Sequence, residues 1–145
     1  MLKKIAIIII TPTHTKKSFN LGLTIAKKFD SELSVIQCVY KMPPKFYFFE
    51  TRSDKEFTKK QKEKIKKELV KWEEIANKKG IRIKTKFALT DSVANWVIEY
   101  VKENKIELVI VDYPKLSLVE MNQYDDIINM IHHKAHCHVL TTKDN

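Results

Sequence analysis

The chain has 145 residues, 43% of them hydrophobic, and a formal net charge of +9 at pH 7. This length suits one domain with its own core, so we expect a single domain over residues 1–145. No apolar run approaches the roughly 20 residues of a membrane span, which argues against an integral membrane protein.

The N-terminal isoleucines follow two lysines, but a Thr-Pro-Thr-His segment stands where a signal peptide would have a small-residue cleavage site. The two cysteines, Cys38 and Cys137, lie in apolar, strand-like surroundings, which indicates buried thiols and not a disulfide framework. We therefore expect a soluble cytoplasmic protein.

A positive charge of this size could attract nucleic acid or an anionic membrane. The lysines, however, are spread over nearly every predicted helix and interleaved with glutamates, and Arg52 and Arg82 are the only arginines. Such a pattern is typical of a solvated surface, so we expect neither nucleic acid nor a membrane as a partner.

The first regular element is the apolar run from Ile5 to Ile10, which is rich in β-branched residues and does not alternate with polar ones. Such a run predicts a strand buried on both faces, as in a parallel sheet covered by helices. Because open α/β sheets bind ligands beyond the carboxyl ends of their strands, the segment Thr11–Thr15 marks the candidate ligand end.

Strand and helix patterns alternate along the rest of the chain. Apolar, β-branched runs predict strands, and apolar residues at intervals of three and four predict helices. The expected elements are, in order, a helix from Thr15 or Ser18 to about Phe29, a strand Leu33–Tyr40, a helix from Ser53 or Asp54 to about Lys79, a strand Ile81–Ala88, a helix capped by Asp91 or Ser92, a strand Leu108–Val111, a helix of about Gln123–His133 and a strand Cys137–Thr142. Residues 41–54 and the segment Tyr113–Met121 are expected to be irregular. Five strands alternating with four helices predict an α/β domain with a doubly wound sheet.

The first irregular segment contains four adjacent aromatic residues, Phe46, Tyr47, Phe48 and Phe49. Two interpretations stay open. The rings either cover one end of the core, which we favour, or form an exposed patch that docks an unknown protein partner.

Several segments of the chain are similar to those of one known family. They are the N-terminal Lys-Lys-Ile-Ala-Ile-Ile-Ile, residues 26–35, Ile98–Val111, which is similar to a helix followed by D-L-I-V-M-G, and Lys134–Leu140, which is similar to H-A-P-C-P-V-L. In order and spacing the chain resembles a universal stress protein domain over nearly its whole length. The resemblance implies a parallel five-stranded sheet of order 3-2-1-4-5, of the adenine-nucleotide α-hydrolase-like type. It also implies a homodimer through the last strand, with His138, Val139, Leu140, Thr141 and Thr142 at the interface.

Members of this family that bind ATP resemble one another in an acidic residue ending the first strand and in a G-x-x-G-x9-G-[ST] loop after the fourth. Here Ile10 stands at the acidic position, and Asp112 stands where the loop has its first glycine. The segment Asp112–Glu120 contains no glycine, and its carboxylates would repel a triphosphate instead of cradling it. The departures predict a domain that does not bind ATP in the family's manner and has no cofactor.

The candidate ligand-binding residues lie at the carboxyl ends of the predicted strands. They are Ile10, Thr11, Thr13, Tyr40, Asp112 and Tyr113. The hydroxyls and His14 could bind a small anion, but loops after strands are also threonine-rich for capping reasons alone. No Ser/His/Asp or Cys/His arrangement has a catalytic spacing, so we expect no catalytic residue.

Four of the five histidines, His132, His133, His136 and His138, fall close together and flank Cys137. Imidazole and thiolate groups are the usual ligands of zinc, nickel and copper. A continuous helix would place His132 and His136 one turn apart, but the expected change from helix to strand separates the side chains. We therefore expect no metal in a single chain, while a dimer that brings two such segments together stays open.

The sequence thus predicts a cytoplasmic, homodimeric, universal-stress-protein-like domain that acts by binding and not by turnover. Two alternatives stay open. One is a small-molecule or divergent nucleotide-binding protein with slow hydrolysis at most, and the other is a metal-responsive dimer that uses residues 132–138.

Overall fold

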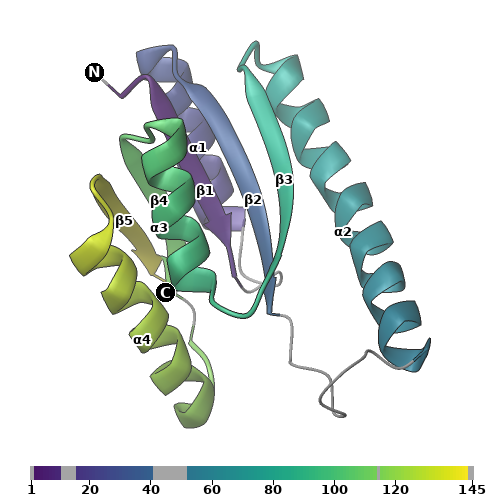
Figure 1. Ribbon diagram of the computed structural model, residues 1–145. Coiled ribbons are helices and arrows are strands. Elements are labelled where there is room, and N and C mark those ends of the chain that lie inside the picture. Colours follow the sequence, from purple (N-terminus) through teal and green to yellow (C-terminus); the bar gives the residue numbers. More distant parts are fainter. Residues whose placement is uncertain (1, 11–15, 41–51, 114, 144–145) are drawn as a thin grey trace.

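The computed structural model describes residues 2–10, 16–40, 52–113 and 115–143 (Figure 1). Strands and helices alternate along these residues, as the sequence predicts. The elements are β1 (Lys4–Ile9), α1 (Lys16–Phe29), β2 (Glu32–Tyr40), α2 (Arg52–Lys78), β3 (Ile83–Thr90), α3 (Val93–Asn104), β4 (Leu108–Tyr113), α4 (Leu118–Lys134) and β5 (His138–Lys143).

The five strands form one sheet in the order β3-β2-β1-β4-β5, and every neighbouring pair is parallel. The predicted strand order and fold class are therefore confirmed. The first strand lies at the centre, where Ile7 is opposite Val35 of β2 and Ile110 of β4. The strand order reverses at β1, so the carboxyl ends of β1 and β4 meet at the point where such sheets bind ligands.

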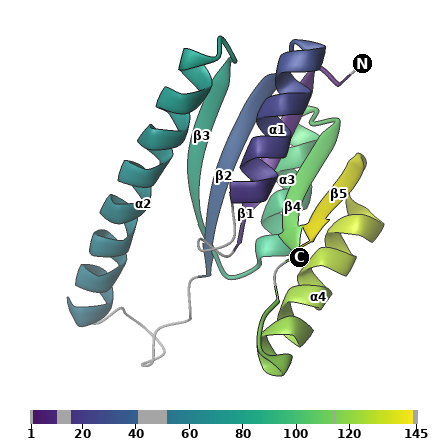
Figure 2. The same ribbon diagram turned by 180° about the vertical axis from the view of Figure 1, so that it is seen from behind.

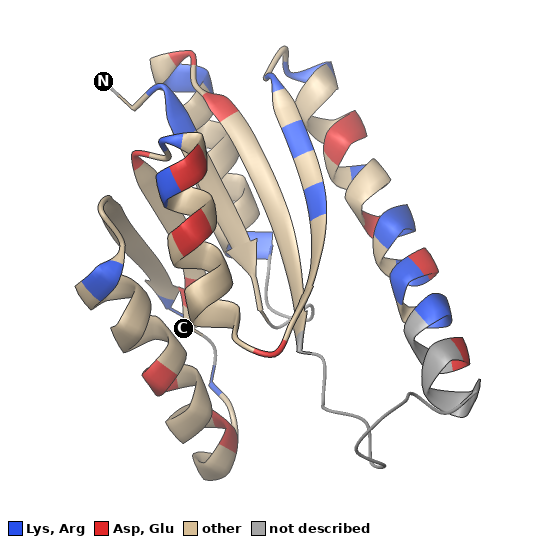
Figure 3. Ribbon diagram, in the orientation of Figure 1, with Lys and Arg blue, Asp and Glu red and all other residues tan. Residues whose placement is uncertain are grey.

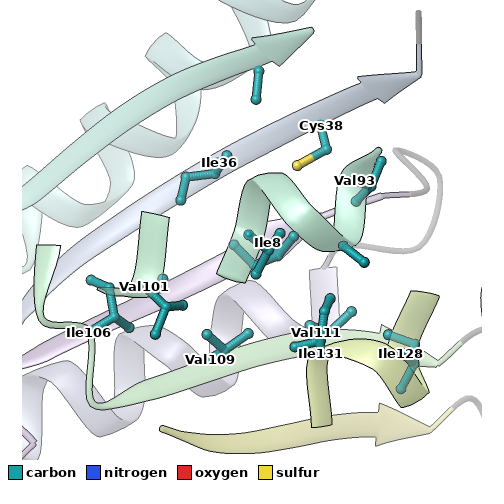
Figure 4. Close-up of a cluster of buried hydrophobic side chains, with 14 of the residues drawn as sticks. Ile8, Ile36, Cys38, Val93, Val101, Ile106, Val109, Val111, Ile128 and Ile131 are labelled. Atoms are coloured by element: carbon teal, nitrogen blue, oxygen red, sulfur yellow. The ribbon is translucent and has the colours of Figure 1, made fainter. Parts of the chain in front are cut away.

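Helices cover both faces of the sheet, α3 and α4 on one and α1 and α2 on the other (Figures 1 and 2). Alternate residues of β1 serve the two cores, because successive side chains of a strand point to opposite faces. Ile8 packs with α3 and α4, and Figure 4 shows it among side chains of β2, β4 and both helices. Ile5 and Ile7 pack toward α1 and are 0% exposed. Each such isoleucine contributes roughly 1.5–3 kcal/mol before entropy is subtracted.

Helix α1 lies unusually close to the central strand at Gly22. A Cβ atom built on Gly22 would stand 2.4 Å from Ile7 Cδ1 and 3.0 Å from Ile7 Cγ1. Only a residue without a side chain fits this position while Ile7 keeps its rotamer.

The long helix α2 packs one apolar stripe, Ile65, Leu69, Trp72 and Ala76, toward α1 and β3. The Trp72 ring lies 4.2 Å from the ring of Phe19, centroid to centroid. The other sides of helix α2 carry lysines interleaved with glutamates (Figure 3). The helix is followed by Gly80 with φ 71°, a left-handed conformation that favours glycine.

Helix α4 begins earlier than the sequence pattern indicates, so the prediction of an irregular segment through Met121 is wrong. Ser117 is the N-cap of α4: its Oγ accepts from the Glu120 N–H at 3.4 Å and donates to Glu120 Oε1 at 2.6 Å. The periodicity misses this turn because Leu118 and Val119 are 80% and 70% exposed and do not pack on the core.

The two cysteines are both free thiols, but they differ in burial. Cys38 is 3% exposed, as predicted, and burial raises the pKa of its thiol to about 12. Cys137 packs against the core but is only half-buried, because it precedes an edge strand, so the prediction of a buried thiol holds for it only in part.

Within residues 2–10, 16–40, 52–113 and 115–143, none of the helices is both long enough and apolar enough to cross a lipid bilayer. The aromatic residues Phe46–Phe49 lie outside the described residues, so neither interpretation of them is tested.

Candidate functional site

The predicted ligand end lies where β1, β2 and β4 finish. Ile8 of β1 is opposite Val111 of β4, so Ile10, Asp112 and Tyr113 follow at the same edge of the sheet. Tyr40 ends β2, with its backbone opposite Thr90 of β3. The structure brings these strand ends together, as the sequence predicts, whereas Thr11 and Thr13 lie outside the described residues.

At the acidic position of the ATP-binding pattern, Ile10 is half-buried and packs against the core shared by α3 and α4. Its side chain is a hydrocarbon, so it has no group that could accept a hydrogen bond from a ribose or a base. The position therefore serves packing.

The Asp112 side chain is held by hydrogen bonds at the end of β4. Asp112 is only 6% exposed. Ser18 Oγ, from the first turn of α1, donates to Asp112 Oδ2 at 3.0 Å, and Thr142 Oγ1, from β5, donates to Oδ1. Asp112 and Thr142 face each other in the register of β4 and β5, which explains the second bond.

Two tyrosines continue this polar cluster on the α4 side. The Tyr124 hydroxyl donates to the main-chain carbonyl of Asp112, and the Tyr113 hydroxyl donates to the Asp125 carboxylate. Burial raises the pKa of Tyr124, and the hydrogen bond to Asp125 raises the pKa of Tyr113. Both phenols therefore stay protonated at neutral pH. Their rings meet edge to face at 6.1 Å.

Side chains from α1, β4, α4 and β5 are thus tied together at the carboxyl end of β4, after which the sequence comparison expects the glycine loop of ATP-binding members. A glycine loop binds phosphates through backbone N–H groups that approach closely. In this chain the Asp112 carboxylate at the end of β4 accepts hydrogen bonds from the hydroxyls of Ser18 and Thr142.

The sequence reading missed Ser18, Thr142 and Tyr124 as partners of Asp112. Ser18 stood out only as a possible helix cap, and it lies inside α1 with 0% exposure. A buried strand that ends in an aspartate was the available signal, because a buried carboxylate requires hydrogen-bond donors nearby.

The histidine segment is spread over a helix end and a strand. His132 and His133 are exposed in the last turn of α4, which ends with an extended residue, Ala135, so His136 does not continue the helix. In the part of the chain that the structure describes, no group of three or more His, Cys, Asp or Glu side chains could hold a metal ion.

The residues expected at a dimer interface form β5, which is an edge of the sheet. His138 and Leu140 are exposed on one side, Leu140 to 38%. Val139 packs against the core on the other side.

No protein-family model and no curated protein matches this chain. Solved structures do match it over nearly the whole length. Universal stress protein UspA from Lactobacillus plantarum is 12% identical, with a TM-score of 0.79 over 97% of this chain and 97% of that chain. A universal stress protein family member from Burkholderia pseudomallei is 12% identical, with a TM-score of 0.75 over 97% of this chain and 96% of that chain.

A family member from Arabidopsis thaliana, whose structure has AMP bound, is 13% identical, with a TM-score of 0.69 over 99% of this chain and 92% of that chain. At such low identities these likenesses establish the architecture. The chain therefore has the fold of the universal stress proteins.

Proposed function

We propose that this chain is a universal-stress-protein-like regulatory domain that acts by binding and dimerisation and does not bind ATP in the family's manner. The observation that carries the proposal is the Asp112 carboxylate, 6% exposed and hydrogen-bonded to Ser18 at the end of β4. A phosphate group near this carboxylate meets a negative charge that little water screens. At 4 Å, two like charges repel by about 4 kcal/mol at an effective dielectric constant of about 20.

A second candidate is a small-molecule or divergent nucleotide site with slow hydrolysis at most. It is favoured by the AMP in the Arabidopsis structure and by the meeting of the β1 and β4 ends in this chain. Ile10, Thr11, Thr13, Tyr40, Asp112 and Tyr113 would form such a site. The hydroxyls would then bind the ligand, and the carboxylate would accept from an amine or a ribose hydroxyl.

The two candidates differ in whether nucleotide stabilises the folded protein. A ligand present at about 100 times its Kd stabilises the native state by about 2.7 kcal/mol. Thermal unfolding is followed with and without ATP or AMP and magnesium, together with mass spectrometry of molecules that co-purify. The proposal expects no shift in the melting temperature and no bound nucleotide. A shift of several degrees, or nucleotide recovered in stoichiometric amount, supports the second candidate.

The proposal includes a homodimer through β5, over His138, Val139, Leu140, Thr141 and Thr142. Edge strands have unpaired backbone groups, and the exposed Leu140 adds apolar area there. Light scattering on wild type and Leu140→Lys distinguishes the states. We expect a wild-type dimer and a monomeric variant at micromolar concentration, and a monomeric wild type contradicts this part.

The same edge supports a third candidate, a metal-responsive dimer. His138 is exposed at the start of β5 and His136 is exposed two residues before it, so a symmetric pair of chains whose axis passes near His138 would bring four imidazoles together. Metal analysis of tag-free protein tests it. Less than about 0.1 equivalent of zinc, nickel or copper removes this candidate.

A further inference from the structure

A groove of about 480 Å³ lies between β3 and α3, on the face of the sheet that α3 covers. It is separate from the hydrogen bonds described for Asp112, because Ser18, Tyr124 and Thr142 do not line it. Its volume is within the range of small-molecule pockets.

Two aromatic rings form the floor of the groove. Trp96 and Tyr100, one turn apart on α3, stack with 5.2 Å between ring centroids and 13° between ring planes. The Tyr100 hydroxyl donates to Ser34 Oγ of β2 at 3.3 Å, which fixes the ring against the sheet. Both residues remain partly exposed, so they offer a preformed flat surface to a planar group.

The two walls of the groove carry opposite charges. Lys84 and Lys86 are exposed on the β3 wall, and Glu99 and Glu103 are exposed on the α3 wall. Lys86 Nζ lies 5.6 Å from the Trp96 ring centroid and 5.7 Å from the Tyr100 ring centroid, at the distance of cation–π contacts, so its ammonium reaches from the β3 wall over both rings.

The charged walls do not close on each other. Lys84 pairs instead with Glu32 at 3.0 Å, and among the described residues no ion pair joins Lys86, Glu99 or Glu103 to any partner. The gap therefore leaves an ammonium on one side and two carboxylates on the other, above an aromatic floor.

The geometry points to a binding site for a small zwitterion with a planar body, the class of an aromatic α-amino acid. The planar body takes the place of Lys86 over the Trp96–Tyr100 pair, the exposed Lys86 side chain moves aside to meet the ligand carboxylate, and the ligand ammonium meets Glu99 and Glu103. A ligand with one charge alone leaves one wall without a partner. It also gains only one of the two charge-assisted hydrogen bonds, each of which is among the stronger contacts a site can offer.

This site does not depend on the function proposed for the strand ends. The test uses three indoles that differ in the charged groups they carry. L-tryptophan has an ammonium and a carboxylate, 3-indolepropionate lacks the ammonium, and tryptamine lacks the carboxylate. Binding is measured by calorimetry and by the NMR shift of the Trp96 indole N–H in the full chain. We expect L-tryptophan to bind about tenfold tighter than either analogue and to shift the Trp96 signal and not that of Trp72.

Two variants assign the walls. Lys86→Gln should weaken L-tryptophan binding about tenfold and leave tryptamine unchanged, whereas Glu99→Gln with Glu103→Gln should weaken L-tryptophan and leave 3-indolepropionate unchanged. Lys62→Gln, and Glu63→Gln with Glu74→Gln, exposed on α2, make the same charge changes elsewhere and should alter nothing. Equal affinities for the three indoles, no binding at millimolar concentration, or equal losses in the α2 controls would overturn the assignment.

Discussion

Replacing Asp112 by alanine removes the acceptor that joins α1, β4 and β5. A hydrogen bond to a charged group is worth about 1.5–3 kcal/mol, so the two bonds from Ser18 and Thr142 sum to roughly 3–6 kcal/mol. Part of this is offset, because the variant no longer buries a carboxylate. We therefore expect Asp112→Ala to lower the free energy of unfolding by about 2–4 kcal/mol. The exposed Asp126→Ala serves as the control and should stay within about 0.5 kcal/mol of wild type.

Urea denaturation measures the coupling free energy between the two side chains from four proteins: wild type, Asp112→Ala, Ser18→Ala and the double variant. Because Ser18 donates to Asp112, the double variant should lose less stability than the sum of the single losses, by about 1–2 kcal/mol. A loss below about 0.5 kcal/mol in Asp112→Ala, or additive losses, would refute the reasoning that this carboxylate ties the strand ends together.

Three further predictions concern packing and titration. Gly22→Ala should destabilise wild type by about 1 kcal/mol, because the new Cβ would stand 2.4 Å from Ile7 Cδ1. In an Ile7→Val background, which lacks this Cδ1 atom, the same substitution should be neutral or stabilising. A double-mutant cycle measured by urea denaturation that shows no coupling between the two positions contradicts this prediction. Main-chain N–H donors, above all that of Lys3, lower the pKa of Glu107 below its ordinary 4.5, so its stabilisation is present above pH 4.5 and is lost as the pH falls through the folded value. Glu107→Gln should therefore be less stable than wild type at pH 7, with the difference shrinking on acidification, and a difference independent of pH in urea titrations argues against it. The Cys38 thiol, whose pKa is about 12, should resist a disulfide reagent at pH 8 in folded Cys137→Ser protein and react on unfolding; rapid native labelling contradicts its burial.

The sequence predicted the fold well because its main signals are strong. The short, β-branched run Ile5–Ile10 indicates a strand covered on both faces, and the stripe Val93, Val97 and Val101 packs as expected. The start of α4 was missed, since its first turn is fixed by the local N-cap Ser117 while Leu118 stays exposed. Hydrophobic periodicity carries no information about such a turn.

The candidate site was harder to predict than the fold. The sequence pattern predicts that Ile10 and Asp112 lie at adjacent strand ends. For Asp112 it indicates only a negative charge that repels phosphate, and not the hydrogen bonds that hold the carboxylate. The hydrogen bond from Ser18 joins residues 94 positions apart, and no local pattern encodes it. The groove beside Trp96 escaped notice for a similar reason, because its two walls come from different elements.

The most direct test of the account is a calorimetric titration of the purified chain with ATP and with AMP, each with magnesium, beside the variant Asp112→Gly. A dedicated nucleotide site would saturate at micromolar concentrations of ligand. We expect no binding heat for wild type even at about ten times those concentrations. Micromolar binding by wild type, with the Asp112 carboxylate in place, would contradict the claim that this residue replaces the phosphate cradle.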